Sequence, residues 1–234
     1  MPRTRRWAIL TLAALTAIGL AACTRNQSSS TGTAALPDGS QLLLTSAAAM
    51  KEVKTAHVTI EVQGTVGGIG LHKADGVLTR AGDAKGTATV DQLGATVEVQ
   101  FVITGGKVYL KGPTGGFQQV PAALASSVYD PSAILDPEKG LAKLLSVVKS
   151  AKTEAKESVG GQDAYRVAVT PAPGSLDALI PGVGDNATGK LWVAADSKRL
   201  LKGEFTVPPS GSDKGGTITV TLTDYDAPVT VSAP

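Results

Sequence analysis

Apolar and polar residues alternate with a period of two through much of residues 58–110, and this pattern constrains the fold more than any other feature of the chain. The apolar members are Val58, Ile60, Val62, Ala88, Val90, Val97, Val99 and Phe101. Val77 and Thr79, and then Val108 and Leu110, mark two more candidate strands. Glycine-containing turns interrupt the pattern roughly every ten residues, as in a meander. We therefore predict a large antiparallel sheet with one dry face and one solvated face.

Two segments have helical periodicity instead. Asp38 is a candidate N-cap, with Gln41 at capping-box spacing, for a helix that should end near Thr55. The buried stripe of this helix is predicted to be Leu43, Ala47, Met50 and Val53. Asp130-Pro131 and Asp136-Pro137 each place an aspartate before a proline, the arrangement of a helix start. The second pair should begin a helix with the stripe Leu141, Leu144, Leu145 and Val148.

A second series of strands follows these helices. Strands are predicted over residues 153–160 (an edge strand), 164–170, 191–193, 201–205 and 218–222, with a short helix over 175–180. Strands and helices follow one another without βαβ alternation, which indicates an α+β fold with its helices on one face of the sheet.

The first 22 residues have the organisation of a signal peptide. Three arginines at positions 3, 5 and 6 precede an uncharged run over 7–20, and Leu20-Ala21-Ala22-Cys23 follows. A membrane-spanning helix needs about 20 apolar residues, so this run is too short to be one. The last four residues resemble the bacterial lipobox, in which the cysteine sulfur takes a diacylglycerol. We expect Cys23 to become an acylated N-terminus; a secreted protein with an incidental cysteine is the alternative.

The remainder divides into a tether and a domain. Residues 23–35 lack periodicity and bulky side chains, which predicts a flexible tether, and residues 36–234 form one domain. Two or three acyl chains on Cys23 would hold this domain firmly at the extracytoplasmic face of the cell membrane.

Charge and cysteine content exclude several classes of protein. Subtracting the three leader arginines from the net charge of +2 leaves −1, so there is no basic surplus for binding nucleic acid. The chain contains one cysteine, which excludes an internal disulfide and a thiolate metal site once Cys23 is acylated.

The sequence makes no case for an enzyme. The two histidines, His57 and His72, belong to no metal-binding motif, and His57 should be solvated on the polar side of its strand. Asp130 and Asp136 are better explained as caps than as paired catalytic carboxylates. We therefore expect no catalytic residue, metal or cofactor.

A large sheet with few helices leaves two possibilities for its dry face. The space beneath the helices is either filled by side chains or forms an elongated aliphatic cavity. A buried acyl chain of about 16 carbons gains roughly 12 kcal/mol before ordering costs, so such a cavity could hold lipid without polar anchors. Composition does not separate the two possibilities.

Several stretches resemble one family along the whole chain. They are the lipobox to Cys23, Leu36-Pro37-Asp38, Lys54-Thr55-Ala56-His57, the block from Tyr129-Asp130-Pro131 through Leu135-Asp136-Pro137 to Gly140-Leu141-Ala142, Gly160-Gly161-Gln162 and Leu191-Trp192-Val193. Together they resemble the actinobacterial LppX/LprA/LprF/LprG lipoproteins. The resemblance implies a half-barrel similar to the carrier LolA, with helices on the concave face enclosing a hydrophobic cavity for acylated lipids.

The family pattern gives no catalytic residues to carry over, so the predicted site is the inward side of the strands and a helical lid. The cavity residues are expected to be Val58, Ile60, Val62, Ala88, Val90, Val97, Val99 and Phe101, with Leu141, Leu144, Leu145 and Val148 on the lid. The resemblance to the LprG and LprA branch implies triacylated glycolipids or triacylglycerol as ligands; LprF remains open.

Two functions compete at this point. The first is an envelope lipid carrier, expected to be monomeric, that moves acylated lipid between the membrane and the outer envelope, with a membrane exporter as a candidate partner. The second is a lipid-anchored accessory module of an exporter or of cell-wall assembly, with a filled core. An esterase acting on bound lipid is a third, weaker candidate.

Overall fold

A computed structural model describes residues 35–66, 70–92, 94–121, 131–176, 179, 183, 185–210 and 214–234. The predicted signal peptide, Cys23 and nearly all of the predicted tether lie outside these residues, as do Tyr129 and Asp130.

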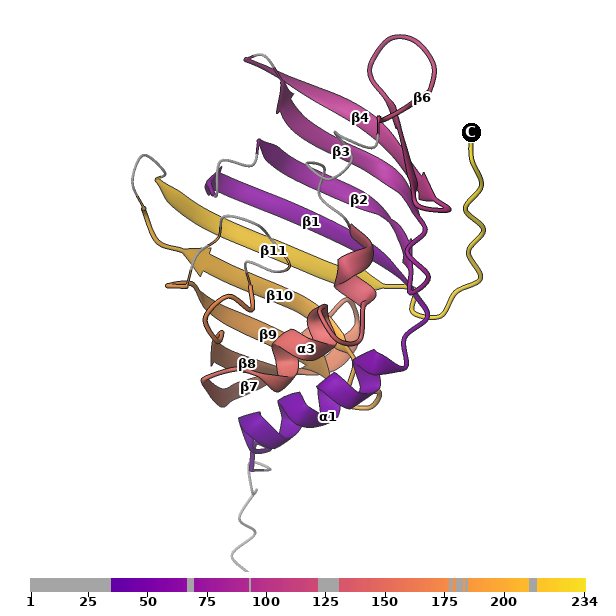
Figure 1. Cartoon of the computed structure of the whole chain (residues 1–234). Coiled ribbons are helices and arrows are strands. Elements are labelled where there is room, and N and C mark those ends of the chain that lie inside the picture. Colours follow the sequence, from indigo (N-terminus) through magenta and orange to yellow (C-terminus); the bar gives the residue numbers. More distant parts are fainter. Residues whose placement is uncertain are drawn as a thin grey trace, which may run out of the picture. The chain divides into compact units, whose positions relative to one another are not determined.

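The described strands form one antiparallel sheet. They are β1 (Thr55–Thr65), β2 (Leu71–Thr79), β3 (Ala84–Gln92), β4 (Ala95–Thr104), β5 (Lys107–Lys111), β6 (Gln118–Gln119), β7 (Ser150–Val159), β8 (Gln162–Thr170), β9 (Thr188–Ala194), β10 (Leu200–Val207) and β11 (Gly215–Thr223). Their order in the 11-stranded sheet is β6-β5-β4-β3-β2-β1-β11-β10-β9-β8-β7. Two meanders, β1–β6 and β7–β11, are thus joined where β1 pairs with β11 (Figure 1). The predicted antiparallel sheet is confirmed, and β7 is an edge strand as predicted.

The first predicted helix is present as α1 (Gly39–Lys51). The Oδ1 atom of Asp38 accepts a hydrogen bond from the backbone N–H of Gln41 at 2.9 Å, so Asp38 is the N-cap. The helix ends four residues before Thr55, because the chain needs Glu52–Lys54 to turn into β1. Val53 is fully buried in that turn although it lies outside the helix.

The second predicted helix is much shorter than expected. Asp136 starts a turn, not a helix: its Oδ1 accepts hydrogen bonds from the N–H groups of Glu138 (2.7 Å) and Lys139 (3.0 Å). The helix, α3 (Leu141–Ser146), begins after Gly140, at which a Cβ would lie 2.4 Å from the carbonyl oxygen of Ala133. This close approach bends the chain and separates the turn from the helix. Before it, Pro131–Leu135 forms a 3₁₀ helix, η1.

The predicted helix over 175–180 is not seen in the described part of that segment. Ser175, Leu176 and Leu179 adopt turns, and the N–H of Leu179 bonds the carbonyl oxygen of Leu176 at 3.0 Å. The other residues of the segment lie outside the described ones.

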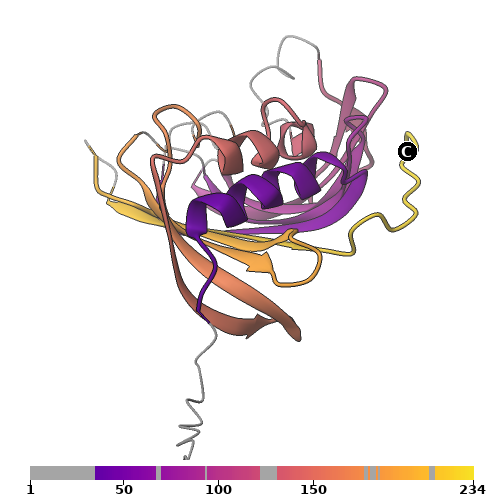
Figure 2. The same ribbon diagram turned by 90° about the horizontal axis from the view of Figure 1, so that it is seen from below.

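The helices lie on the concave face of the sheet. Figure 2 shows α1 and α3 side by side within the curve of the strands, and α1 packs on β7 and β9. The main core forms between them and includes Leu43, Leu144, Leu191 and Ile218. The opposite face was predicted to be solvated, but it is not uniformly so, because Ala164, Trp192, Ala194 and Leu201 form a second small buried cluster there.

Candidate functional site

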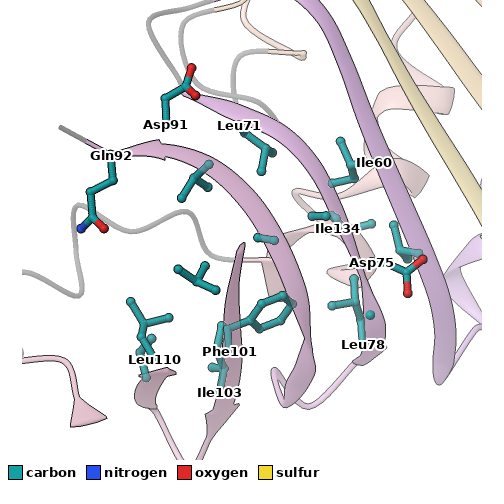
Figure 3. Close-up of a pocket in the computed structure, with 17 residues that line it drawn as sticks. Ile60, Leu71, Asp75, Leu78, Asp91, Gln92, Phe101, Ile103, Leu110 and Ile134 are labelled. Atoms are coloured by element: carbon teal, nitrogen blue, oxygen red, sulfur yellow. The ribbon is translucent and has the colours of Figure 1, made fainter. Parts of the chain in front are cut away.

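A cavity of about 380 Å³ lies between η1 and the concave side of β1–β5 (Figure 3). Its apolar lining consists of Val58, Ile60, Leu71, Ala74, Gly76, Leu78, Ala88, Val90, Val99, Phe101, Ile103, Val108, Leu110 and Ile134. The volume is within the range of about 300–1,000 Å³ typical of small-molecule sites.

Small residues at matching positions of neighbouring strands hollow out this cavity. Ala74 of β2 lies directly opposite Ala88 of β3, and Gly76 lies opposite Gly86 on the same two strands. Side chains directly opposite each other in an antiparallel pair share a face and are close neighbours. Ala74 and Ala88 therefore adjoin with one methyl group each and line the cavity. Gly76 and Gly86 instead let the two strands approach closely, because a Cβ at Gly86 would lie 2.1 Å from the carbonyl oxygen of Asp75.

The cavity is closed at one end and open at the other. Leu78 and Ile103 are 3% and 9% exposed at the closed end, near Ile134 of η1. Ala88, Val90 and Val99 are half-buried, and Asp91 and Gln92, at the end of β3, are exposed. The cavity thus meets solvent near the turn between β3 and β4.

Three polar residues border the cavity. Asp75 turns its side chain to the other face of the sheet, because its partner in the strand register is Thr59, and the Thr59 hydroxyl donates to its Oδ2 at 2.9 Å. The Oδ1 atom of Asp91 accepts from the Thr96 hydroxyl at 2.7 Å and lies 2.9 Å from Nε2 of His72. These two contacts, first the hydroxyl and then the imidazole, lower the pKa of Asp91.

His57 differs from its prediction. It was expected to be solvated, but its side chain is half-buried, and its Nε2 lies 3.2 Å from Oδ1 of Asp75. The pair lies on the convex face, away from the cavity, since His57 alternates with Val58 along β1.

The strand residues of the predicted site largely gather in this cavity. Val58, Ile60, Ala88, Val90, Val99 and Phe101 all line it. Val62 and Val97 lie on the same strands but outside its lining; Val62 packs against the main core and Val97 is half-buried. Whether any of these residues contacts lipid stays a prediction.

The four predicted lid residues lie elsewhere. Leu141, Leu144 and Leu145 are at most 5% exposed and belong to the core formed with α1, and Val148 packs against that core. None of them lines this cavity, because α3 packs beside α1 and leaves η1 to cover β2. Ile134 therefore occupies the covering position that the sequence assigned to α3.

Sequence reasoning missed eight residues of the apolar lining: Leu71, Ala74, Gly76, Leu78, Ile103, Val108, Leu110 and Ile134. Continuing the alternation past Phe101 and across the next turn would have identified Ile103, Val108 and Leu110. Along β2 the sequence analysis named only Val77 and Thr79, and both have the convex phase, since Val77 pairs with His57 and Thr79 pairs with Thr55. A register shift between Leu71 and Lys73 hides the correct phase from simple alternation.

No group of three or more potential metal ligands occurs among the described residues. None of the described helices has both the length and the apolar character needed to cross a bilayer.

Comparison with known proteins agrees with this architecture. Residues 38–231 match the profile of the LppX_LprAFG lipoproteins. The lipoarabinomannan carrier protein LprG of Mycolicibacterium smegmatis is 32% identical, over 100% of this chain and 98% of that protein. The protein of the same name from Mycobacteroides abscessus is 33% identical, over 94% of each chain. These names describe carriers, in agreement with the prediction of a protein that is not an enzyme.

Two solved structures share the fold. LprF from Mycobacterium bovis has a TM-score of 0.72 at 23% identity, covering 83% of this chain and 96% of that one. LppX from Mycobacterium tuberculosis has a TM-score of 0.61 at 23% identity, covering 82% of this chain and 99% of that one. By its profile match and its similarity to LprG over the full length, the chain belongs to the LppX_LprAFG lipoprotein family.

Proposed function

We propose that this protein binds acylated lipids in the cavity beneath η1 and carries them between the cell membrane and the outer envelope. The observation that carries the proposal is an apolar cavity of about 380 Å³ whose lining includes the facing alanines Ala74 and Ala88. The relatives named as lipoarabinomannan carriers support it. Triacylated glycolipids and triacylglycerol are the proposed ligands.

Burial of acyl chains supplies the driving force for binding. Each methylene that leaves water contributes about 0.8 kcal/mol. Ordering the chain and the protein opposes this gain. An aliphatic lining binds by contact area, not by directed bonds, so it accepts acyl chains of different lengths and retains them reversibly. That is the behaviour a carrier needs.

The anchor completes the proposal. Cleavage before Cys23 and its acylation would hold the domain at the extracytoplasmic face of the membrane, with residues 24–35 as the tether. The carrier could then reach membrane lipid without leaving the surface.

The direct test is native mass spectrometry of the chain from residue 23 onward with Cys23→Ser, after incubation with tripalmitin. We expect a bound lipid. Ala88→Trp fills the hollow between β2 and β3 and should abolish loading, whereas Thr89→Trp, one residue along on the convex side, should not. Equal loading of both tryptophan variants would contradict the cavity as the site, and no loading of the parent chain would contradict the carrier function. If side chains fill the space beside Ala88, the Ala88→Trp variant should instead lose about 1–3 kcal/mol of unfolding free energy.

A further inference from the structure

A groove of about 410 Å³ lies on the convex face of the sheet, across β7 to β10. A row of residues that pair in register crosses it: Lys152 with Ala168, Ala168 with Lys190, and Lys190 with Glu204. Val169, which follows Ala168 on β8, belongs to the core on the concave face. Successive side chains of a strand point to opposite faces, so the row faces away from that core. The groove is therefore separate from the cavity beneath η1.

Two lysines flank the floor of this groove. Strands lie about 4.8 Å apart in a sheet, so Lys152 and Lys190 begin about 10 Å from each other, with the methyl group of Ala168 between them. Both lysines are exposed, and neither forms an ion pair with another of the described residues. The carboxylate of the lining, that of Glu204, lies 3.1 Å from Nζ of Lys202. The groove therefore has a surplus of positive charge, and two flexible ammonium groups can converge over Ala168.

Hydroxyl groups border the two lysines. Ser150 pairs with Thr170, and Thr188 pairs with Thr206, two positions along each strand from the row that contains the lysines. All four hydroxyl residues line the groove. Ammonium and hydroxyl groups donate the hydrogen bonds that a phosphate accepts. No aromatic ring lies among the described residues of the lining, so a nucleotide base would have nothing to stack on. The lining thus fits a phosphate group better than a nucleotide.

The groove lies at the same edge of the sheet as the opening of the cavity. Antiparallel pairing places the ends of β1, β3, β8 and β10 along one edge, together with the starts of β2, β4, β7, β9 and β11 (Figure 1). Gln92 at the cavity opening and Ser150 in the groove both lie at this edge. Gly39, at the start of α1, is there too, since a Cβ on it would lie 2.9 Å from the carbonyl oxygen of Ala151. The chain therefore enters the domain at the edge that bears both the groove and the opening.

This point of entry indicates which edge faces the membrane. Residues 24–35 form the predicted tether between Cys23 and the domain, and a flexible chain of about 12 residues has an r.m.s. end-to-end distance of about 20 Å. β7 has 10 residues, and a strand of that length spans about 33 Å. An acylated Cys23 would thus keep this edge near the bilayer more readily than the far edge. The positive charge of the groove would meet the phosphates of anionic phospholipids there.

We propose that the groove formed by Lys152, Ala168 and Lys190 is a membrane-docking site that binds the phosphate of an anionic phospholipid in the bilayer. Docking would turn the edge that bears the cavity opening toward the membrane, so that an acyl chain could pass between bilayer and cavity with little exposure to water. The docking itself needs no lipid in the cavity. Only its use in lipid transfer rests on the proposed carrier function.

Vesicle flotation tests the docking site. The chain from residue 23 onward with Cys23→Ser, which lacks the acyl anchor, is mixed with vesicles of dioleoyl phosphatidylcholine alone or with an equal part of dioleoyl phosphatidylglycerol. The parent chain should bind the anionic vesicles far better than the neutral ones, and added salt should release it. The double variant Lys152→Gln/Lys190→Gln should bind the anionic vesicles about 25-fold more weakly, which is about fivefold for each lysine.

Lys85→Gln/Lys107→Gln is the matched control. Both lysines are exposed on the convex face, at the starts of β3 and β5 and hence at the opposite edge, and the variant loses the same charge. It should bind anionic vesicles as the parent chain does. All four lysines are exposed, so each variant should fold, and thermal melting checks this.

Three results would overturn the docking site. They are equal binding of the parent chain to neutral and anionic vesicles, an equal loss of binding in the two double variants, and lysine-dependent binding of inorganic phosphate without any binding of vesicles. The last result would assign the groove to a free anion. Each of them leaves the carrier function standing if native mass spectrometry still finds lipid in the parent chain. Absence of that lipid, with docking intact, would instead defeat the carrier function alone.

Discussion

The two meanders of the sheet share one pattern of alternation but differ in what covers them. On the concave face of β7 and β9, α1 packs with α3 beside it, and Leu43, Leu144 and Leu191 are at most 1% exposed. Over β1–β5, η1 packs on β2 and Ile134 is its contribution to the cavity lining.

Small residues in the strands have different consequences in the two halves of the sheet. At Gly189 and Gly203 the ring of Phe205 fills the space, since a Cβ on Gly189 would lie 2.7 Å from its Cδ1. Ala74 and Ala88 instead line the cavity. Small residues in a strand thus indicate a binding site only where no aromatic side chain packs over them.

We call β7–β11 with α1 and α3 the packed half of the sheet, and β1–β5 with η1 the hollow half. The largest predicted loss of stability is in the packed half. Leu144→Ala removes a side chain that is 1% exposed and should lower the unfolding free energy by about 2–5 kcal/mol. Leu110→Ala, in the hollow half, should cost about 1 kcal/mol because the side chain already borders a void and leaves little new cavity. Urea denaturation of both variants measures the difference. Equal losses would mean that the two halves are packed alike.

Substituting larger residues for small ones should also affect stability more in the packed half than in the hollow half, but by less than Leu144→Ala does. Gly189→Ala should destabilise the fold by about 1–3 kcal/mol, since Phe205 must move. Ala88→Val should change stability by no more than about 0.5 kcal/mol while reducing lipid loading. Thermal unfolding and native mass spectrometry report the two quantities, and a strongly destabilised Ala88→Val would show that the hollow is filled.

The smallest predicted loss of stability is at the junction of the two halves, where β1 pairs with β11. The Oδ1 atom of Asp226, just after β11, accepts from the N–H of Lys54 at 2.8 Å, and the N–H of Asp226 bonds the carbonyl oxygen of Thr55 at 2.9 Å. The backbone bond from Lys54, and then Arg199, lower the pKa of Asp226. This carboxylate therefore stabilises the fold above its unfolded pKa of about 3.9, and the contribution is lost as pH falls through the lower folded value.

Asp226→Asn should accordingly cost about 1 kcal/mol at neutral pH. The difference from the parent chain should shrink in urea titrations below about pH 4. A difference that is constant from pH 7 to pH 3 would show that the charge of Asp226 plays no part.

The strands were predictable because alternation is a local pattern. Helix α1 was predictable because its N-cap and its apolar stripe both lie within residues 38–53. The site was predictable only in part. Ala88 and Val99 follow from alternation, but the bulge at Leu71 and the opposite phase of Val77 depend on pairing with β1 and β3. The prediction placed the residues of α3 over the cavity, although they do not line it. The apolar stripe of α3 shows that the helix is buried, but it does not show against which half of the sheet the helix packs.

Photolabelling is the most direct test that acyl chains enter the hollow half. The Cys23→Ser chain is loaded with a triacylglycerol that carries a diazirine in one acyl chain, irradiated and digested with trypsin. We predict adducts on the peptide of residues 86–107, which contains Ala88, Val99 and Phe101, and none on residues 144–149 of the packed half. Adducts on residues 144–149 or 191–198, with residues 86–107 unlabelled, would contradict the account.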